Sequence, residues 1–379
     1  MHIVLITTSF PDGEPGREAA GSFVADFARQ LARHARVTVV AAASTDSTSR
    51  DGDVEVVRFA VPRTPLSLLR PLYPGDWPAI LKTMRVGKAA VQRVVDTTQP
   101  DYLFSLWALP SGGWAQSVGR DAKTRYAVWA LGSDIWSLGR LPLLRSKLRS
   151  VLRAADACFA DGMKLAKEVE DLSGRDCGFL ASSRRLPPPA SNEKSVGAPY
   201  KLAYLGRWHV NKGSDLLLES LGQLSTDDWS KISAVRIFGG GPLQDSIERG
   251  AEELRDQGRP VETGGYLDKQ GAADLIGWSD FLLLPSRIES VPVIFSDAVQ
   301  LGTPIVATPV GDLPILFDKY AVGVLAQGVS AHEMANAIRR ALADAPGRYR
   351  SGLKAAAVDF DIAVAAEEFA RQTRQAIHA

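Results

Sequence analysis

Short apolar runs alternate along the first half of the chain with segments in which apolar residues recur every three or four positions. The first pattern is typical of buried strands and the second of amphipathic helices. Their regular alternation predicts a parallel sheet with helices on both faces. The expected strands are His2–Thr7, Val37–Ala41, Val54–Phe59, Tyr102–Leu106, Tyr126–Leu131, Ala157–Ala160 and Cys177–Leu180, and the expected helices follow Ser22 and cover Ile80–Val95, Ser111–Val118, Leu143–Ala154 and Met163–Leu172.

The pattern breaks once and then resumes. Between Pro187 and Pro199, Pro, Ser, Asn and Gly dominate and the periodicity is lost, which predicts a linker between two domains. The second half then repeats the alternation of strands and helices. Its expected strands are Lys201–Leu205, Val235–Phe238, Val261–Thr263, Phe281–Leu284 and Pro304–Ala307, and its expected helices are Leu216–Leu224, Leu243–Leu254, Gln270–Ile276, Val291–Leu301, Met334–Leu342 and a tail helix from Phe360 through Ile377.

Length and composition fit this organisation. A chain of 379 residues is long for one hydrophobic core and comfortable for two, and 45% hydrophobic with 23% charged residues is ordinary for a soluble globular protein. We expect an α/β protein with domains at 1–190 and 191–358 and a C-terminal segment at 359–379. No apolar run approaches the roughly 20 residues of a membrane span, and no signal peptide is recognisable, so we expect a cytoplasmic protein.

The net charge of +1 conceals an asymmetry. Residues 1–195 carry 26 Lys and Arg against 20 Asp and Glu, whereas residues 196–379 carry 18 against 23. Between Arg58 and Arg93, seven cations accompany one acid, Asp76, among leucines and aromatic residues. Such a surface suits an anionic membrane or an anionic acceptor. The segment Leu141–Ala154 is also basic and amphipathic; it fits either a membrane surface or a helix packed on the sheet.

Metal and redox chemistry have little support in the sequence. Cys158 and Cys177 lie in apolar runs and are expected to be reduced core thiols, and the five histidines lack the spacing of metal ligands. We therefore expect no metal and no cofactor. The GxGxxG dinucleotide fingerprint is absent as well, which argues against a dehydrogenase.

The stretch from Leu284 to Pro314 carries the clearest chemistry. A strand ends before Pro285, a loop carries Glu289, and a helix is expected to begin near Val291. Ligands of open parallel sheets bind beyond the carboxyl ends of strands, where helix N-termini attract phosphates. Ser290, Val291, Pro292 and Val293 would line this helix start, and Asp297 follows two turns along the helix. The two carboxylates are therefore expected to reach opposite ends of one ligand.

A second turn offers two cations. Gly206 and Arg207 follow an expected strand, and Lys212 precedes a helix at Gly213. Two cations that converge at the end of a strand suit a diphosphate, because they neutralise the charge of a leaving group. Solvated surface cations are the alternative interpretation of the same pair.

These elements resemble the retaining glycosyltransferases of family 4, which have the GT-B fold of two Rossmann-like domains with parallel sheets facing a central cleft. The resemblance implies that Glu289 meets the donor sugar, that Asp297 holds the nucleotide ribose, and that Arg207 and Lys212 bind the diphosphate. It also implies that the last helix crosses back onto the first domain, which would hold the acceptor. The family has Glu where this chain has Asp297, and many relatives have His where it has Leu106 and Leu131.

Four further positions come from the same resemblance. Gly21 and Gly240 would let the backbone approach the donor, Tyr266 would stack on the base, and Asp134 would face the sugar. Each has a structural alternative: a loop hinge at Gly21, a tight turn at Gly240, core packing for Tyr266, and a helix N-cap for Asp134.

The resemblance thus implies a metal-independent retaining hexosyltransferase. Its donor would be a UDP- or GDP-linked sugar, and its acceptor a glycan or lipid-linked molecule in cell-surface polysaccharide or glycolipid synthesis. Peripheral contact with an anionic membrane is expected through the basic N-terminal domain, and nucleic acid is not an expected partner. A UDP-sugar epimerase and a non-catalytic nucleotide-sugar or glycan-binding protein of the same fold are the alternatives.

Overall fold

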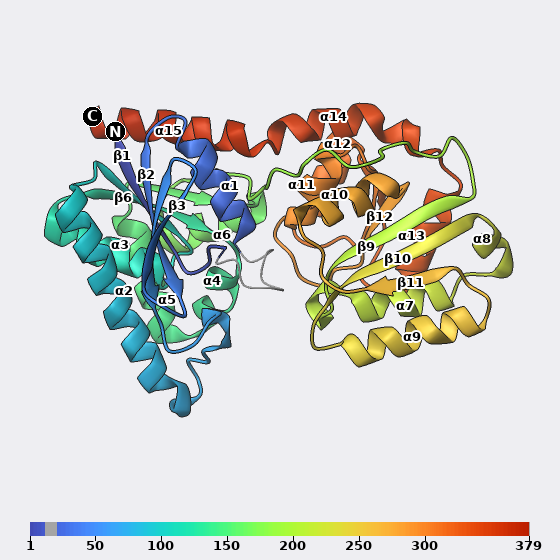
Figure 1. Cartoon of the computed structure of the whole chain (residues 1–379), viewed down its shortest axis with the longest axis horizontal. Coiled ribbons are helices and arrows are strands. Elements are labelled where there is room, and N and C mark those ends of the chain that lie inside the picture. The colour runs from blue at the N-terminus through green and yellow to red at the C-terminus, as the bar shows by residue number, and fades with distance from the viewer. Residues whose placement is uncertain (12–20, 379) are drawn as a thin grey trace. The chain divides into compact units, whose positions relative to one another are not determined.

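The computed structural model describes residues 1–11 and 21–378 and divides the chain into two compact units (Figure 1). Unit 1 comprises Met1–Ser182 together with Ile362–Ala379, and unit 2 is Ser183–Asp361. The division thus falls eight residues before the domain boundary expected at 190, and the last helix belongs to unit 1.

Unit 1 is built on a sheet of eight strands in the order β3-β4-β2-β1-β5-β6-β7-β8, which is parallel except where β3 pairs with β4. The strands are β1 (His2–Thr7), β2 (Arg36–Ala43), β3 (Ser47–Asp51), β4 (Val54–Ala60), β5 (Tyr102–Leu106), β6 (Arg125–Ala130), β7 (Ala157–Ala160) and β8 (Cys177–Phe179). The helices are α1 (Ser22–Leu31), α2 (Trp77–Thr98), α3 (Ser111–Ala122), α4 (Ser133–Trp136), α5 (Pro142–Ala154), α6 (Met163–Ser173) and α15 (Ile362–His378), with short 3₁₀ turns η1 (Leu66–Leu68), η2 (Pro74–Asp76) and η3 (Leu138–Arg140).

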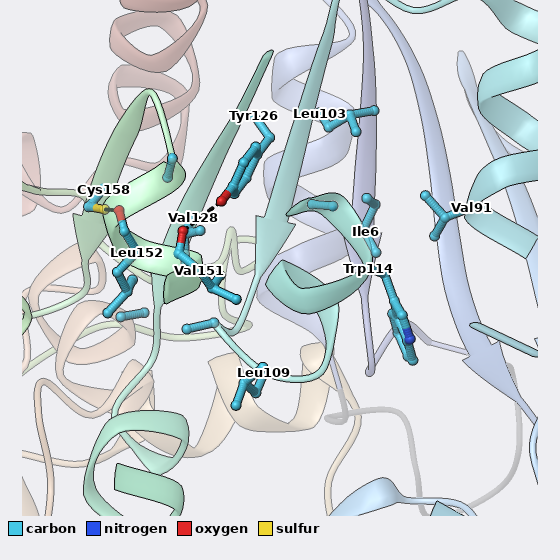
Figure 2. Close-up of a cluster of buried hydrophobic side chains, with 14 of the residues drawn as sticks. Ile6, Val91, Leu103, Leu109, Trp114, Tyr126, Val128, Val151, Leu152 and Cys158 are labelled. Atoms are coloured by element: carbon cyan, nitrogen blue, oxygen red, sulfur yellow. Dashed lines mark hydrogen bonds between the residues drawn. The ribbon is translucent and has the colours of Figure 1, made fainter. Parts of the chain in front are cut away.

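The central strand β1 is buried on both faces because helices cover both sides of the sheet. Successive side chains of a strand point to opposite faces. Ile3 and Leu5 accordingly pack with α1 and α15, whereas Val4 and Ile6 join the cluster under α2, α3, α5 and α6. Figure 2 shows this second cluster, in which the hydroxyl of Tyr126 donates a hydrogen bond of 2.6 Å to the carbonyl of Val151.

The segment Leu141–Ala154, expected either on a membrane surface or packed on the sheet, contains α5. α5 packs on the sheet through Leu148, Val151 and Leu152, while its arginines and Lys147 stay exposed. The structure therefore supports the packed interpretation of Leu141–Ala154 and leaves the basic outer face in place.

The strand β3 was not expected from the sequence, because its residues are mostly exposed and carry no apolar alternation.

Unit 2 has a fully parallel sheet in the order β11-β10-β9-β12-β13-β14. The strands are β9 (Tyr200–Arg207), β10 (Ile232–Gly240), β11 (Val261–Gly264), β12 (Phe281–Leu284), β13 (Ile305–Ala307) and β14 (Gly323–Leu325). The helices are α7 (Ser214–Gly222), α8 (Thr226–Ser230), α9 (Gln244–Asp256), α10 (Lys269–Trp278), α11 (Val293–Gln300), α12 (Leu313–Tyr320), α13 (Ala331–Leu342) and α14 (Arg350–Asp359), with 3₁₀ turns η4 (Val210–Lys212) and η5 (Pro346–Tyr349).

The segment expected to be a linker is fastened to unit 2. The Lys194 ammonium donates to the carbonyls of Gly277 and Ser279 at 2.8 and 2.7 Å, at the end of α10. The hydroxyl and the backbone N–H of Ser195 both donate to the carboxylate of Asp280. Residues 190–199 therefore form an ordered strap, although their composition is that of a flexible connection.

Candidate functional site

The site of unit 2 follows from the topology of its sheet. From β9 the chain proceeds outward to β10 and β11, and it then returns to place β12 on the other side of β9. The loops after β9 and β12 therefore leave neighbouring strands in opposite directions. In open parallel sheets this switch point is where ligands bind.

The two loops are joined by direct contacts. The Arg287 guanidinium donates to the carbonyl of Val210 at 2.8 Å and to the Asp215 carboxylate at 2.7 Å. Gly213 has φ +69°, and a Cβ there would lie 1.9 Å from the carbonyl oxygen of Pro285. Only glycine fits this contact, so the Gly that follows Lys212 fixes the position of the first loop against the second.

The three residues expected to carry the chemistry lie on these loops or, for Arg207, at the end of the strand before one of them. The Lys212 ammonium forms an ion pair with Glu289, whose same oxygen accepts a hydrogen bond of 3.0 Å from the hydroxyl of Ser286. The Glu289 side chain is only 10% exposed, whereas that of Lys212 is 40% exposed. Arg207 is the last residue of β9, and its exposed guanidinium forms no ion pair with the residues that the structure describes. The site thus combines one oriented carboxylate, one cation bound to it and one exposed cation.

The helix after Glu289 begins later than expected. α11 starts at Val293 rather than near Val291, because Pro292 has ψ 135° and occupies the N-cap position. Ser290 is buried, and its hydroxyl has no hydrogen-bond partner within residues 1–11 and 21–378. Gly311, at φ +54°, packs against the carbonyls of Glu289 and Ser290, where a Cβ would lie 2.4 and 2.2 Å away. The loop before α11 is therefore fixed by its contact with Gly311, and the unpartnered hydroxyl of Ser290 lies beside the start of the helix.

Asp297 lies deeper than the ribose contact implied by the resemblance. Its side chain is fully buried, and both carboxylate oxygens accept hydrogen bonds of 2.7 to 3.0 Å from the guanidinium of Arg184. Sequence reasoning missed Arg184, which is 113 residues away. The one available signal was chemical, because a buried aspartate requires a cation or several donors. The ribose role of Asp297 stays a prediction.

Two glycines at the end of β10, Gly239 and Gly240, allow close contacts with neighbouring segments. A Cβ at Gly239 would lie 1.9 Å from the carbonyl oxygen of Gly206, and one at Gly240 would lie 2.8 Å from the ring of Tyr266. The Tyr266 hydroxyl donates to the carbonyl of Gly240 at 2.6 Å, yet the side chain is half exposed. Core packing is therefore not the role of Tyr266, and the ring has a free surface beside the turn after β10.

The two candidates in unit 1 lie at the switch point of its own sheet or next to it. Gly21 has φ +72°, and a Cβ there would lie 2.7 Å from the backbone of Ser9, in the loop after β1. The buried Asp134 carboxylate accepts hydrogen bonds from the N–H groups of Ala108 at 2.6 Å and Leu131 at 3.2 Å. The N-cap interpretation of Asp134 is wrong, since Gly132 holds that position. Asp134 instead joins the loops after β5 and β6.

Residues 1–11 and 21–378 contain neither a cluster of metal ligands nor a helix that could span a membrane. No group of three or more His, Cys, Asp and Glu side chains in this part of the chain could hold a metal ion. Each helix there is too short or too polar to cross a membrane.

Two Rossmann-like units with parallel sheets define the GT-B class of fold. Solved structures with this fold align with the whole chain. The sucrose-phosphate synthase of Thermosynechococcus elongatus has a TM-score of 0.78 at 17% identity and covers 100% of this chain and 99% of its own. Anabaena HepE, solved with UDP and glucose, has a TM-score of 0.69 at 15% identity and covers 99% and 100%. At these sequence identities, the similarity is evidence for a shared fold alone.

A match to a known family lies within the sequence of unit 2. Residues 199–344 match the family described as "Glycosyl transferases group 1", which confirms the resemblance inferred from the spaced motifs.

Curated relatives carry names from glycan and glycolipid synthesis. The Bacillus subtilis protein named "Putative teichuronic acid biosynthesis glycosyltransferase TuaC" is 30% identical over 278 residues, which are 69% of this chain and 64% of that protein. A GDP-mannose-dependent mannosyltransferase of Mycolicibacterium smegmatis, named for phosphatidylinositol monomannoside, is 23% identical over 90% of this chain and 89% of its own. The match thus spans less than two thirds of TuaC but nearly all of the mannosyltransferase.

Proposed function

We propose that the chain is a retaining, metal-independent glycosyltransferase that moves a hexose from a UDP- or GDP-linked donor to a glycan or lipid-linked acceptor, in polysaccharide or glycolipid synthesis. The observation that carries this proposal is the arrangement of Arg207, Lys212 and Glu289 at the switch point of β9 and β12. Support comes from the names of the relatives and from HepE, a structural neighbour solved with UDP.

Each residue has a distinct part in the proposed reaction. Arg207 and Lys212 neutralise the diphosphate as the bond between the sugar and the nucleotide breaks, which lowers the energy of the transition state. The N-terminus of α11 adds unpaired N–H groups and the positive end of the helix dipole on the same side of the sheet. These groups supply positive potential without a metal ion.

Glu289 orients the sugar, because its carboxylate is already fixed by Lys212 and Ser286 before a donor arrives. The acceptor attacks from the face that the nucleotide leaves, so configuration is retained. The proton of the acceptor hydroxyl passes to the departing phosphate, so the reaction requires no separate protein base. Attack and departure on one face distinguish this route from inversion.

A thermal-shift screen of the purified chain with UDP, GDP, ADP and their common sugar conjugates tests the donor site. A ligand that binds only the folded state raises the melting temperature by mass action. We expect one nucleotide to stabilise the chain and Arg207→Ala to remove the shift, while Arg236→Ala, which lies on β10 and pairs with Glu262, keeps it. If no nucleotide shifts the melting temperature, the proposal fails.

One observation favours a second candidate, a non-catalytic nucleotide-sugar-binding protein. The second carboxylate of the family motif, Asp297, is buried and occupied by Arg184, so it does not face solvent. Incubation with the stabilising nucleotide-sugar separates the two candidates. Slow hydrolysis of the donor to free sugar of retained configuration supports the enzyme, whereas stabilisation without turnover supports the binding protein.

A further inference from the structure

Trp107 has a backbone conformation that large residues rarely adopt. Its φ is +68°, in the left-handed region where a Cβ is crowded by the following carbonyl oxygen. In the described part of the chain, three other non-glycine residues have positive φ, and each is the C-cap of a helix: Gln99, Lys123 and Ala321. A left-handed residue is common at a helix end. Trp107 instead follows a strand, so helix capping does not explain its conformation.

Hydrogen bonds on both sides of Trp107 fix this conformation. Its N–H donates to the carbonyl of Trp129 at 2.9 Å, and its carbonyl accepts from the N–H of Gly112 at 3.2 Å. The next N–H, of Ala108, donates to the buried carboxylate of Asp134 at 2.6 Å. A strained residue persists only where its surroundings hold it, and such residues are concentrated at ligand sites. Trp107 is therefore a candidate for contact with a ligand.

Trp107 lies at the switch point of the sheet in unit 1. It comes directly after β5, which pairs in parallel with β1 on one side and with β6 on the other. The chain runs outward from β1 to β2 and β4 and then returns to β5, so the loops after β1 and β5 leave in opposite directions. Ligands of open parallel sheets bind at such a point. The strained residue and the expected ligand thus share one edge of the sheet.

The side chains at this edge are partly exposed. Phe23, in the first turn of α1, and Leu131, after β6, pack against the same hydrophobic cluster as Trp107, and all three keep part of their surface accessible. The rings of Phe23 and Trp107 meet edge to face, with 6.3 Å between their centroids. The indole N–H of Trp107 forms no hydrogen bond with the described residues and is accessible to solvent. The edge thus offers an aromatic surface with one unused donor.

An aromatic face with a polar donor at its rim matches the chemistry of a sugar. One face of a pyranose ring carries C–H groups, whose slightly positive hydrogens are attracted by the negative face of an aromatic ring. The hydroxyl groups around the sugar ring accept hydrogen bonds from donors such as an indole N–H. Because the backbone holds the indole in place before a ligand arrives, stacking on it orders few additional groups.

We propose that a hexopyranose ring binds unit 1 by stacking on Trp107, with Phe23 supporting the indole and the indole N–H donating to a sugar hydroxyl. This inference rests on the proposed function in one respect. In that reaction the stacked ring belongs to the acceptor, because the donor site is in unit 2. The acceptor would therefore present a sugar to unit 1, whether it is a free glycan or a glycan carried on a lipid.

Saturation-transfer difference NMR on the full chain tests the stacking, with the methyl glycosides of glucose, galactose, mannose and N-acetylglucosamine as probes. We expect at least one glycoside to bind the wild type saturably in the absence of nucleotide. Trp107→Gly should weaken this binding by about fivefold or more, because the aromatic face is lost, whereas Trp107→Phe should keep most of it. Glycine adopts a φ of +68° without strain, so the backbone of Trp107→Gly should stay in place.

The matched control is Trp278→Ala in unit 2. Trp278 is also partly exposed, but it ends α10 just before β12 and therefore lies at the amino edge of its sheet. The Arg236 guanidinium lies 4.1 Å from the centre of its ring. This variant should bind the glycosides like the wild type.

The thermal shift with nucleotide separates this inference from the proposed function. The shift should persist in Trp107→Gly, since the nucleotide site is in unit 2. Loss of both the shift and the glycoside binding in this variant would show that Trp107 serves the fold, and would overturn the inference. Binding of no glycoside by the wild type, or equal binding by Trp107→Gly, would overturn it as well. Glycoside binding that depends on Trp107, in a chain that no nucleotide stabilises, would support the stacking and overturn the glycosyltransferase proposal alone.

Discussion

Glu289 illustrates how a single carboxylate is prepared for a ligand. Its charge is balanced by Lys212, and its orientation is fixed by the hydroxyl of Ser286. Glu289 is proposed to orient the sugar and not to bind the nucleotide. Its loss should therefore reduce catalysis and leave the affinity for the nucleotide nearly unchanged.

Glu289→Gln should therefore reduce transfer by about 100-fold or more, because the side chain keeps its size but loses the charge that binds the sugar in the transition state. Nucleotide affinity, measured by calorimetry, should change by less than about threefold. Glu262→Gln, an exposed acid on β11, is the control and should leave both quantities unchanged. An equal loss of turnover and affinity would show that Glu289 serves nucleotide binding or the fold.

Arg184 and Asp297 form a buried ion pair within unit 2. Removal of one member leaves a buried charge without its partner, which typically costs about 3 to 5 kcal/mol. Arg184→Ala should lower the free energy of unfolding in urea by that amount. The exposed neighbour Arg185 provides the comparison, and Arg185→Ala should cost less than about 1 kcal/mol. Similar values for the two variants would mean that the pair contributes little.

At the scale of elements, the loops after strands carry the sites of both units. In unit 2 the loops after β9 and β12 are joined by Arg287, and in unit 1 the loops after β5 and β6 are joined by Asp134. The two residues that link these loops differ in charge and in burial. Arg287 is partly exposed, whereas Asp134 is a carboxylate enclosed by protein.

Burial raises the pKa of Asp134 to about 6, even though backbone N–H groups favour its ionised form. The folded chain then holds the proton more tightly than the unfolded chain, whose aspartate has a pKa near 3.8. The stability contributed by this group is complete below about pH 4 and is lost as the pH rises through 6. The free energy of unfolding of the wild type, relative to Asp134→Asn, should fall by about 2 to 3 kcal/mol between pH 4 and pH 7. Parallel pH profiles for the two proteins would contradict the shift.

The sequence predicted elements where burial imposes a periodic pattern. Strands such as β1 and β12 are continuous apolar runs, and both are found as expected. Exposed β3 lacks such a pattern, and the start of α11 depends on the ψ angle of Pro292 rather than on hydrophobicity. The strap at 190–199 has the composition of a linker, but tertiary hydrogen bonds of Lys194 and Ser195 hold it.

The candidate site was predictable to the extent that it is local. Lys212, Gly213 and Glu289 are each placed by a strand and the loop after it, so spacing along the chain was informative. Arg184 could not be found in this way, because the contact with Asp297 depends on a tertiary approach across 113 residues. The exposure of the Tyr266 ring could not be predicted either, because the sequence pattern gives the residue type but not its burial.

At the scale of the whole molecule, the chain has two compact units, and the last helix completes one of the two hydrophobic clusters of unit 1. Phe369 of α15 is 1% exposed, and its ring lies 4.0 Å from that of Phe104 on β5, between centroids. It also contacts Phe27 of α1 and Phe159 of β7. The stability of unit 1 therefore depends on residues at both ends of the chain.

Phe369→Ala should destabilise unit 1 by about 3 to 5 kcal/mol, because it leaves a cavity among aromatic rings. In a calorimetric scan the variant should lower the transition of unit 1, while a nucleotide that binds at β9 and β12 should raise that of unit 2. Val364→Ala, an exposed position on α15, should leave the scan unchanged. Hydrogen exchange of β1 and β10 identifies which unit each transition reports. If Phe369→Ala leaves the exchange of β1 unaltered, α15 is dispensable to the core.

The place of α15 in this core sets an order for folding during synthesis. The ribosome makes β1 before unit 2 and α15 after it. Domains usually fold in the order in which they emerge. Here unit 2, which is continuous in sequence, has all its residues available before unit 1 does, and β1 must await the synthesis of α15 on the far side of unit 2. Loss of α15, by an early stop codon or by a protease, would thus damage a core whose strands were translated before unit 2.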